Sequence, residues 1–317
     1  MRQRALGDLT VSRIGLGTAT WGAAAKPADA REQLLAYLDA GGNLVDTADI
    51  YVDGASETLL GQLIGPVVPR SSIVLASKAA GVTGDGKPGR QDASRAHLLA
   101  ALDASLASLG TDHLDLWQMH VWDPATPIEE TLAAIDTALS SGRVRHAGIC
   151  NYAGWQTALA ASGPVRIVSA QAEYSLLERG IEREVVPAAA SLGLGVLPWA
   201  PLGRGVLTGK YRAGVPERRQ RNPAFRWYVG HHLKSERTAD IVDEVAKAAA
   251  ELGASPAAVS LAWVRDRPQV IAPLVGARNA EQLREALAAE ALELPDSVRT
   301  RLDEVSAPYI GYPESGI

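Results

Sequence analysis

The fold of this chain is decided by residues 73–119, which read IVLASKAAGVTGDGKPGRQDASRAHLLAALDASLASLGTDHLDLWQM. Apolar runs at Ile73–Ser77 and at Leu114–Met119 predict two buried strands. Between them, apolar residues recur with the spacing of a helix, with Asp92 as the expected N-cap and Gly110 just beyond the end. These apolar residues are Leu98, Leu102, Leu106 and Leu109. The stretch therefore predicts a strand–helix–strand unit with parallel strands.

The same alternation runs along the rest of the chain and brings the number of predicted strands to eight. The other six are expected at Ile14–Thr18, Asn43–Asp46, His146–Ile149, Ile167–Gln171, Gly195–Trp199 and Val270–Val275. A doubly wound open sheet and a closed barrel both satisfy this alternation. The count of eight and the absence of a linker favour one α/β domain over residues 1–317, a (β/α)8 TIM barrel with an N-terminal hairpin.

Two stretches predict long loops. Gly81–Gly89, rich in glycine, follows the third strand, and Arg212–Lys234, rich in arginine and aromatic residues, follows the seventh. Loops that follow strands lie at the carboxyl end of a barrel, where barrel enzymes build their active sites. We therefore expect both loops to border the site.

The glycines near the first strand test the main rival fold. A Rossmann fold requires Gly-x-Gly-x-x-Gly between the first strand and the first helix. Here Gly15 and Gly17 are followed by Gly22, two residues too late. The pattern therefore argues against an open-sheet dehydrogenase, and these glycines otherwise only let the chain turn at the end of a strand.

The composition excludes several classes of protein. With 31 basic and 36 acidic residues the net charge is −5, which disfavours nucleic acid or an anionic membrane as the main partner. Hydrophobic residues make up 47% and charged residues 21%, as in ordinary globular proteins. The one cysteine, Cys150, excludes an internal disulfide and fits a cytoplasmic protein. We expect no membrane span, signal peptide or metal site, because no apolar run is long enough and the histidines lack ligand spacing.

Ionisable side chains stand at the ends of three consecutive predicted strands. Asp46 ends the second strand and Tyr51 follows five residues later, while Lys78 and His120 end the third and fourth strands. Each has a plainer interpretation, as a turn residue, a rim aromatic, a solvated lysine or a packed histidine. In a barrel, however, these positions converge on one mouth, so we predict that they act together.

These four side chains suit proton transfer to a carbonyl group. A tyrosine with a pKa of about 10 is a poor acid at neutral pH. A neighbouring ammonium stabilises the phenolate, so we expect Lys78 to lower the pKa of Tyr51. Asp46 would keep Lys78 charged and in place, and His120 would hydrogen-bond a carbonyl oxygen and orient it.

Eight segments at predicted strand ends carry a wider pattern. They are residues 43–51 (NLVDTADIY), 54–57 (GASE), 77–78 (SK), 118–120 (QMH), 148–152 (GICNY), 171–177 (QAEYSLL), 198–205 (PWAPLGRG) and 275–283 (VGARNAEQL). In this order they resemble the signature of the aldo-keto reductase family, over essentially the whole chain. The branch that they resemble most includes the voltage-gated potassium channel β-subunits and related bacterial reductases.

The resemblance implies a barrel that binds NADP(H) in an extended pose, with Tyr51 as the general acid. Its catalytic tetrad would be Asp46, Tyr51, Lys78 and His120. The residues that it implies around the cofactor are Gly17, Thr18, Trp21, Cys150, Asn151, Gln171, Trp199, Ala200, Pro201, Leu202, Arg204, Lys210, Gly276, Arg278, Gln282 and Glu285.

At the nicotinamide end, the resemblance implies that Cys150, Asn151 and Gln171 hold the carboxamide. Cys150 stands where serine is common. Trp199 stands where tyrosine is common and would stack on the nicotinamide ring; its alternative role is that of a core aromatic.

At the other end, the resemblance implies that Leu202 and Lys210 lie along the pyrophosphate, with Arg204 at a position where glycine is common. Arg278, Gln282 and Glu285 would surround the adenosine. A helix is expected to begin near Asn279, and a helix N-terminus favours a phosphate independently of the resemblance. Arg278 adds a guanidinium suited to a 2′-phosphate.

We therefore predict an NADPH-dependent reductase of a small-molecule carbonyl substrate. The aromatic residues expected to line the substrate pocket are Trp21, Trp122, Phe225, Trp227 and Tyr228. The rival prediction is a cofactor-sensing regulatory subunit with slow turnover, like the channel β-subunits. Those subunits carry asparagine where this chain has His120, which favours the enzyme. No pattern in the sequence predicts an oligomeric state.

Overall fold

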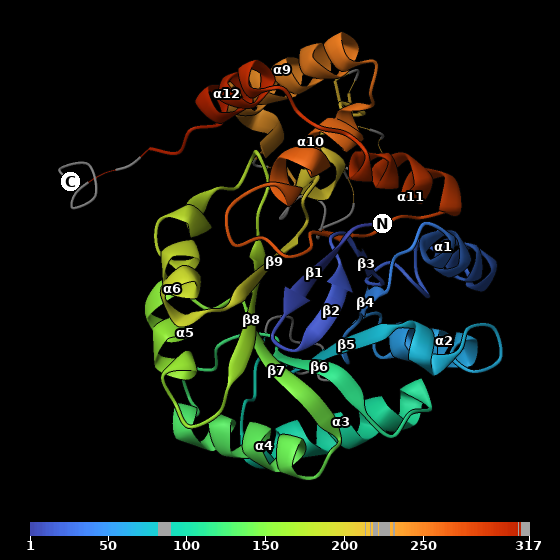
Figure 1. The fold of residues 1–317 in the computed structure, drawn as a ribbon, viewed down its shortest axis with the longest axis vertical. Helices are drawn as coiled ribbons and strands as arrows, with labels where there is room; N and C mark the ends of the chain where they lie inside the picture. Colours follow the sequence, from blue (N-terminus) through green and yellow to red (C-terminus); the bar gives the residue numbers. More distant parts are fainter. Residues whose placement is uncertain are drawn as a thin grey trace.

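The computed structural model describes residues 1–81, 90–212, 214–215, 217, 221, 229–230, 232–309 and 311. Within them, eight strands pair in parallel in the order β10-β3-β4-β5-β6-β7-β8-β9 (Figure 1). They are β3 (Gly15–Gly17), β4 (Leu44–Asp46), β5 (Val74–Ala79), β6 (Leu114–Met119), β7 (Val144–Cys150), β8 (Ile167–Glu173), β9 (Gly195–Trp199) and β10 (Leu274–Val275). A bridge between Val196 in β9 and Val270, shortly before β10, joins the two ends of the sheet. The chain is therefore a (β/α)8 TIM barrel, as predicted.

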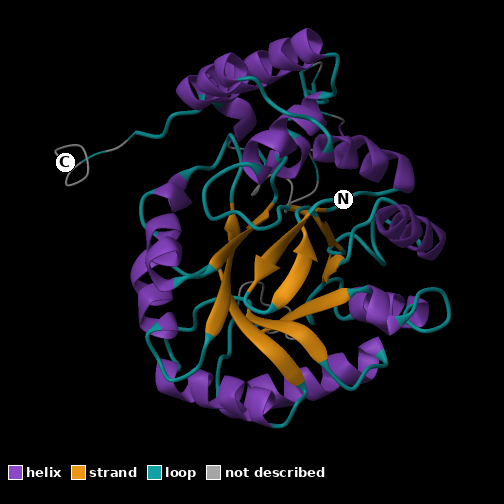
Figure 2. Cartoon of the chain, in the orientation of Figure 1, coloured by secondary structure: helices purple, strands orange, loops and turns teal. Residues whose placement is uncertain are grey.

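Helices follow the strands and surround them, as Figure 2 shows. They are α1 (Pro27–Asp39), α2 (Ala55–Leu63), α3 (Arg95–Leu109), α4 (Ile128–Ser140), α5 (Gly154–Ala161), α6 (Val185–Leu192), α9 (Glu236–Leu252), α10 (Pro256–Arg265), α11 (Ala280–Leu287) and α12 (Asp296–Val305). Short 3-10 turns lie at Arg70–Ser72, Gly180–Glu182, Gly203–Gly205, His232–Lys234 and Ala288–Glu290. No helix in the described residues is long and apolar enough to cross a membrane.

An N-terminal hairpin closes one end of the barrel. It consists of β1 (Gln3–Leu6) and β2 (Leu9–Ser12), which pair antiparallel. Leu6 and Val11 of this hairpin are buried against residues inside the barrel. These partners are Leu44, Ala76, Leu116, Val168, Leu197, Ala272 and Leu274. Because the hairpin seals the amino end, the carboxyl end is the open mouth, which is where active sites of this fold lie.

Two local predictions are wrong. Helix α3 has Ser94 as its N-cap, whose Oγ accepts a hydrogen bond from the backbone N–H of His97, and Asp92 instead accepts from the N–H of Ser94. The strand predicted at Val270–Val275 is also reduced to Leu274–Val275. It is shortened because Pro273 has no N–H to donate to a strand ladder.

The two predicted long loops follow β5 and β9, the third and seventh strands of the barrel. Residues 82–89 of the first lie outside the described residues, as do residues 213, 216, 218–220, 222–228 and 231 of the second. The predicted pocket residues Phe225, Trp227 and Tyr228 are among them.

Candidate active site

Lys78 is the centre of a buried polar cluster at the mouth of the barrel. Its side chain is fully buried. Its Nζ donates hydrogen bonds to Asp46 Oδ1 at 2.5 Å, to the backbone carbonyl of Thr47 at 2.8 Å and to Tyr51 Oη at 3.1 Å. An ammonium group has three donors, so each one has an acceptor. Three of the four predicted catalytic residues therefore meet around one cation.

The neighbouring strands β4 and β5 bring these groups together. Asp46 is the last residue of β4 and pairs in register with Ala76, two residues before Lys78 in β5. Beyond Tyr51 the chain turns through Val52 and Asp53, whose φ angles of 53° and 52° lie in the left-handed region. Such angles cost a non-glycine residue about 1–3 kcal/mol and cluster at functional sites.

Burial and charge together set the protonation of this cluster. Burial disfavours the charged form of Lys78, but the charge of Asp46 outweighs it, so the pKa of Lys78 is raised. Burial also raises the pKa of Tyr51, and Lys78 offsets only part of that rise. The lowered pKa predicted for Tyr51 is therefore wrong in this structure. The phenol keeps its proton at neutral pH beside a charged ammonium.

His120 lies against Tyr51 at the same mouth. The two rings meet edge to face, with centroids 5.8 Å apart and planes at 80°. The pKa of His120 is lowered to about 3, first by burial and then by the charge of Lys78. Its Nδ1 is buried and has no hydrogen-bond partner among the described residues. The imidazole is therefore neutral at physiological pH.

Two buried amides hold the second oxygen of Asp46. Its Oδ2 accepts hydrogen bonds from Gln171 Nε2 at 3.0 Å and from Gln118 Nε2 at 3.3 Å. The Cys150 thiol donates to Gln171 Oε1 at 3.7 Å. Burial raises the pKa of Cys150 to about 12, so this thiol is neutral. The amides thus neutralise part of the Asp46 charge without adding a charge of their own.

A chain of polar contacts runs along the mouth from Trp199 to His120. The indole Nε1 of Trp199 donates to Asn151 Oδ1 at 2.9 Å, and Asn151 Nδ2 donates to the backbone carbonyl of His120 at 2.9 Å. The guanidinium of Arg204 lies 5.0 Å from the centre of the Trp199 ring and forms an ion pair with Glu173 at 3.8 Å. Trp199 is only partly buried, so part of the indole is exposed to solvent beside Arg204.

The residues after β9 form a tight turn beside Trp199. Ala200 and Arg204 have φ angles of 49° and 54°, again in the left-handed region. Pro201 is buried, Leu202 is partly exposed, and Lys210 is exposed with its Nζ 5.2 Å from the centre of the Tyr211 ring. The turn therefore presents a basic side chain close to the mouth.

On the other side of the mouth, β3 and β10 lie side by side. The N–H and Oγ1 of Thr18 both donate to the backbone carbonyl of Asp46, at 3.0 and 3.1 Å. A Cβ on Gly276 would lie 3.6 Å from the carbonyl oxygen of Gly17, in ordinary van der Waals contact, so the two backbones are neighbours. Helix α11 begins with Asn279 as its N-cap, as predicted. The exposed side chains around this helix start include Arg278, Gln282 and Glu285, together with Glu281 and Arg284.

The described aromatic pocket candidates have different surroundings. Trp21 is fully buried and its Nε1 donates to Gln33 Oε1 at 3.3 Å, so it packs in the core. Trp122 is partly exposed and meets the rings of Tyr152 and Trp155 edge to face, with centroids 5.3 and 5.4 Å away. Trp155 was not predicted, although 60% of it is exposed. Trp122 therefore borders the mouth, two residues after His120.

Gln118 was also missed by sequence reasoning. The available signal was a glutamine inside an otherwise apolar strand, two residues before His120 and hence on the same face of the strand.

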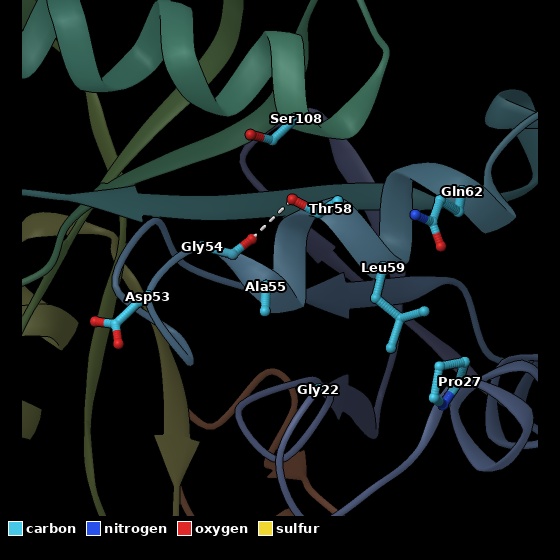
Figure 3. A pocket seen from close by; sticks show the side chains of 9 residues that line it. All are labelled: Gly22, Pro27, Asp53, Gly54, Ala55, Thr58, Leu59, Gln62 and Ser108. Carbon is cyan, nitrogen blue, oxygen red and sulfur yellow. Dashed lines mark hydrogen bonds between the residues drawn. The ribbon is translucent and has the colours of Figure 1, made fainter.

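Of the two described grooves, one borders the mouth with the polar cluster around Lys78 and the other lies elsewhere. One groove, of about 510 Å³, lies on the outside of α2 (Figure 3). Its lining residues are Gly22, Pro27, Asp53, Gly54, Ala55, Thr58, Leu59, Gln62 and Ser108, and none belongs to the predicted tetrad. A second groove, of about 430 Å³, includes Asn151 and Glu173 and borders the mouth. The chemistry therefore belongs to the mouth and not to the groove at α2.

Comparison with known proteins agrees with this geometry. The family model described as "Aldo/keto reductase family" matches residues 13–307. This chain belongs to the aldo/keto reductase family. It is 35% identical over 313 residues to "Uncharacterized oxidoreductase YrpG" of Bacillus subtilis, covering 94% of this chain and 93% of that protein.

Other relatives of this aldo/keto reductase carry more specific names. It is 31% identical to "Putative voltage-gated potassium channel subunit beta" of Schizosaccharomyces pombe, covering 84% of this chain and 81% of that protein. It is 28% identical to "Probable aryl-alcohol dehydrogenase AAD4" of Saccharomyces cerevisiae, covering 90% of each chain. The family and the names of the Bacillus and Saccharomyces relatives support an oxidoreductase.

Proposed function

We propose that this chain is an NADPH-dependent reductase that converts aldehydes or ketones to alcohols. One observation carries the proposal: Tyr51 Oη accepts a hydrogen bond from a fully buried, charged Lys78. A phenol held in this way is a proton donor aimed into an open mouth. We place the enzyme in the cytoplasm, because its one cysteine, Cys150, is a buried free thiol of the kind a reducing compartment maintains.

The proposed proton transfer follows from the direction of this hydrogen bond. Because Lys78 donates to Tyr51 Oη, the hydroxyl hydrogen of Tyr51 is left for another acceptor. The proposed acceptor is the carbonyl oxygen of the substrate, which gains negative charge as the carbon is reduced. When the proton leaves, the ammonium stabilises the phenolate and Asp46 Oδ1 keeps the ammonium in place.

His120 is proposed to orient the same carbonyl oxygen. A neutral imidazole carries one N–H donor, and the low pKa of His120 keeps it neutral. Its ring contacts Tyr51, so a single oxygen atom can accept from both groups. The two donors would then define where the substrate carbonyl lies.

The described residues fit a dinucleotide at the mouth. A reduced nicotinamide cofactor would supply the hydride that this chain has no group to supply. The Asn151 and Gln171 amides are suited to a carboxamide, and the partly exposed Trp199 ring is suited to a planar heterocycle. Gly17 and Gly276, neighbours at the ends of β3 and β10, carry no side chains, and Gly276 lies shortly before α11.

NADPH is proposed over NADH because of the exposed groups at the start of α11. The first N–H groups of a helix favour an anion, and Arg278 stands next to the N-cap Asn279. A guanidinium matches a phosphate with two parallel hydrogen bonds. Leu202, Lys210, Gln282 and Glu285 complete the proposed path of the cofactor.

A second candidate function is an NADP(H)-sensing subunit with slow turnover. It is favoured by the relative from Schizosaccharomyces pombe that is named a channel subunit. We rank it second because His120 supplies a donor to the substrate oxygen.

The experiment that tests the proposal compares Tyr51→Phe with the wild type. NADPH consumption is followed by absorbance over a panel of aldehydes, ketones and sugars. We expect the variant to lose about 10²–10⁴-fold in kcat, because only the proton source is removed. NADPH affinity should be retained, because the ring still packs. Tyr37→Phe is the matched control, since Tyr37 is buried away from the tetrad and hydrogen-bonds the backbone carbonyls of Ile14 and Leu44.

A Tyr51→Phe variant that keeps most of the wild-type kcat would refute the mechanism. A wild type that binds NADPH but reduces nothing in the panel would favour the sensing subunit.

A further inference from the structure

Level with Lys78, the interior of the barrel contains a polar pair that the proposed mechanism does not use. Gln118 in β6 and Ser169 in β8 are both fully buried. Ser169 Oγ donates to Gln118 Oε1 at 3.2 Å, and Gln118 Nε2 donates to Asp46 Oδ2 at 3.3 Å. The amide group of Gln118 is therefore held at both ends, and its donor end faces the Asp46 carboxylate.

Gly148 in β7 makes room for this pair. A Cβ at this position would lie 2.1 Å from Ser169 Oγ and 3.0 Å from Gln118 Cγ, closer than van der Waals contact permits. A side chain on the strand between β6 and β8 would therefore push Gln118 and Ser169 apart. Four adjacent strands, β5 to β8, thus contribute to one interior layer of the barrel. In strand order the contributions are the Lys78 ammonium, the Gln118 amide, the space at Gly148 and the Ser169 hydroxyl.

We propose that Gln118, held by Ser169 over Gly148, is a positioning residue that orients the Asp46 carboxylate toward Lys78. The inference rests on the proposed function and adds to it a residue that touches neither substrate nor cofactor. Asp46 is linked to Tyr51 by hydrogen bonds through Lys78, so the orientation of its carboxylate helps to decide where the ammonium lies. Two amide donors on Oδ2 leave Oδ1 for the ammonium.

Gln171 alone does not fulfil this role in the proposed enzyme. It lies nearer the mouth, where its Oε1 accepts from the Cys150 thiol and where the proposed function assigns its amide to a carboxamide. Gln118 lies one layer deeper, and no described solvent-exposed group contacts its amide. Its hydrogen bond to Asp46 is therefore independent of what occupies the mouth.

Two variants separate positioning from general packing. Gln118→Met has a similar volume and no donor, so we expect kcat to fall about ten- to a hundredfold with an unchanged NADPH dissociation constant. Gln118→Glu places a second carboxylate beside Asp46, so its activity at neutral pH should be lower still. As the pH falls, that carboxyl group takes up a proton and donates to Asp46, so the activity of Gln118→Glu should rise.

The pH profile is the readout that a merely structural role would not move. The wild-type pH profile reflects the titratable groups already present around this interior. They are Asp46, Asp49, Tyr51, Glu57, Lys78, His120 and Cys150. They are the same in both variants, so a rise toward acid pH in Gln118→Glu alone belongs to the new carboxyl group. Tyr37→Phe controls for the loss of buried hydrogen bonds, because it should lower the melting temperature and leave kcat unchanged.

The crystal structure of Gln118→Met provides a test that needs no substrate. We expect the Asp46 carboxylate to rotate and its contact with Lys78 to lengthen. An unmoved carboxylate, or parallel pH profiles for the two variants, overturns the inference even if the wild type is an active reductase. If the wild type has no reductase activity but Asp46 rotates in Gln118→Met, the proposed function is refuted and the positioning role is still supported.

Discussion

Replacing Lys78 with methionine removes one partner of a buried ion pair. The side chains of Lys78 and Asp46 are 0% and 3% exposed, so the Asp46 carboxylate would be left buried away from solvent and without its counter-ion. Breaking such a pair costs about 3–5 kcal/mol, because the remaining charge is uncompensated. We therefore expect the free energy of unfolding to fall by about 4 kcal/mol. The melting temperature should fall by on the order of 5–15 °C.

The double variant Asp46→Asn/Lys78→Met tests the origin of that loss. Asparagine is neutral and keeps an oxygen that Gln118 and Gln171 can hydrogen-bond. Urea unfolding followed by circular dichroism should show that the double variant recovers a coupling free energy of about 2 kcal/mol. Reductase activity should stay lost in both single variants and in the double variant. Single-variant losses that add to within about 0.5 kcal/mol would refute the idea that an unpaired charge causes the destabilisation.

Three further predictions concern the mouth. The pKa of His120 is lowered to about 3, so the imidazole is neutral across the working range and kcat for reduction should show no step near its ordinary value of 6.5; a step there that disappears in His120→Asn contradicts this. Arg278→Ala should reduce the preference for NADPH over NADH by about ten- to a hundredfold, measured as dissociation constants, and equal wild-type affinities would exclude the assignment. NADPH should quench the tryptophan fluorescence, and Trp199→Ala should remove part of the quench; an unchanged quench places Trp199 in the core.

The strand positions and several helix ends were predictable because they depend on local patterns. Apolar runs, Gly110 after α3 and Asn279 before α11 each have a short-range cause that a sequence carries. The last strand is shortened by Pro273, a local signal that the surrounding apolar run obscured. The hydrogen bond from the Ile271 N–H to the carbonyl of Val196 in β9 joins residues far apart in the chain and has no local signature.

The residues of the candidate site were predictable from the sequence, but their burial, pKa shifts and hydrogen-bond partners were not. Strand ends located Asp46, Lys78 and His120, since parallel strands meet at one end of a barrel. The direction of the pKa shift of Tyr51 was missed because it depends on how deeply the ring is buried. Gln118 was missed because its function depends on Ser169, which lies two strands away in the barrel.

The pairing of β10 with β3 has a consequence for synthesis. Leu274 and Val275 pair with Gly15 and Leu16, so the strand made last closes the barrel against the barrel strand made first. Until the ribosome has released the chain beyond residue 275, β3 and β9 are open sheet edges. Open edges can pair with other chains, and contacts between distant residues form slowly. A nascent chain of this protein therefore exposes two unpaired strand edges, which must be kept from pairing with other chains during most of translation.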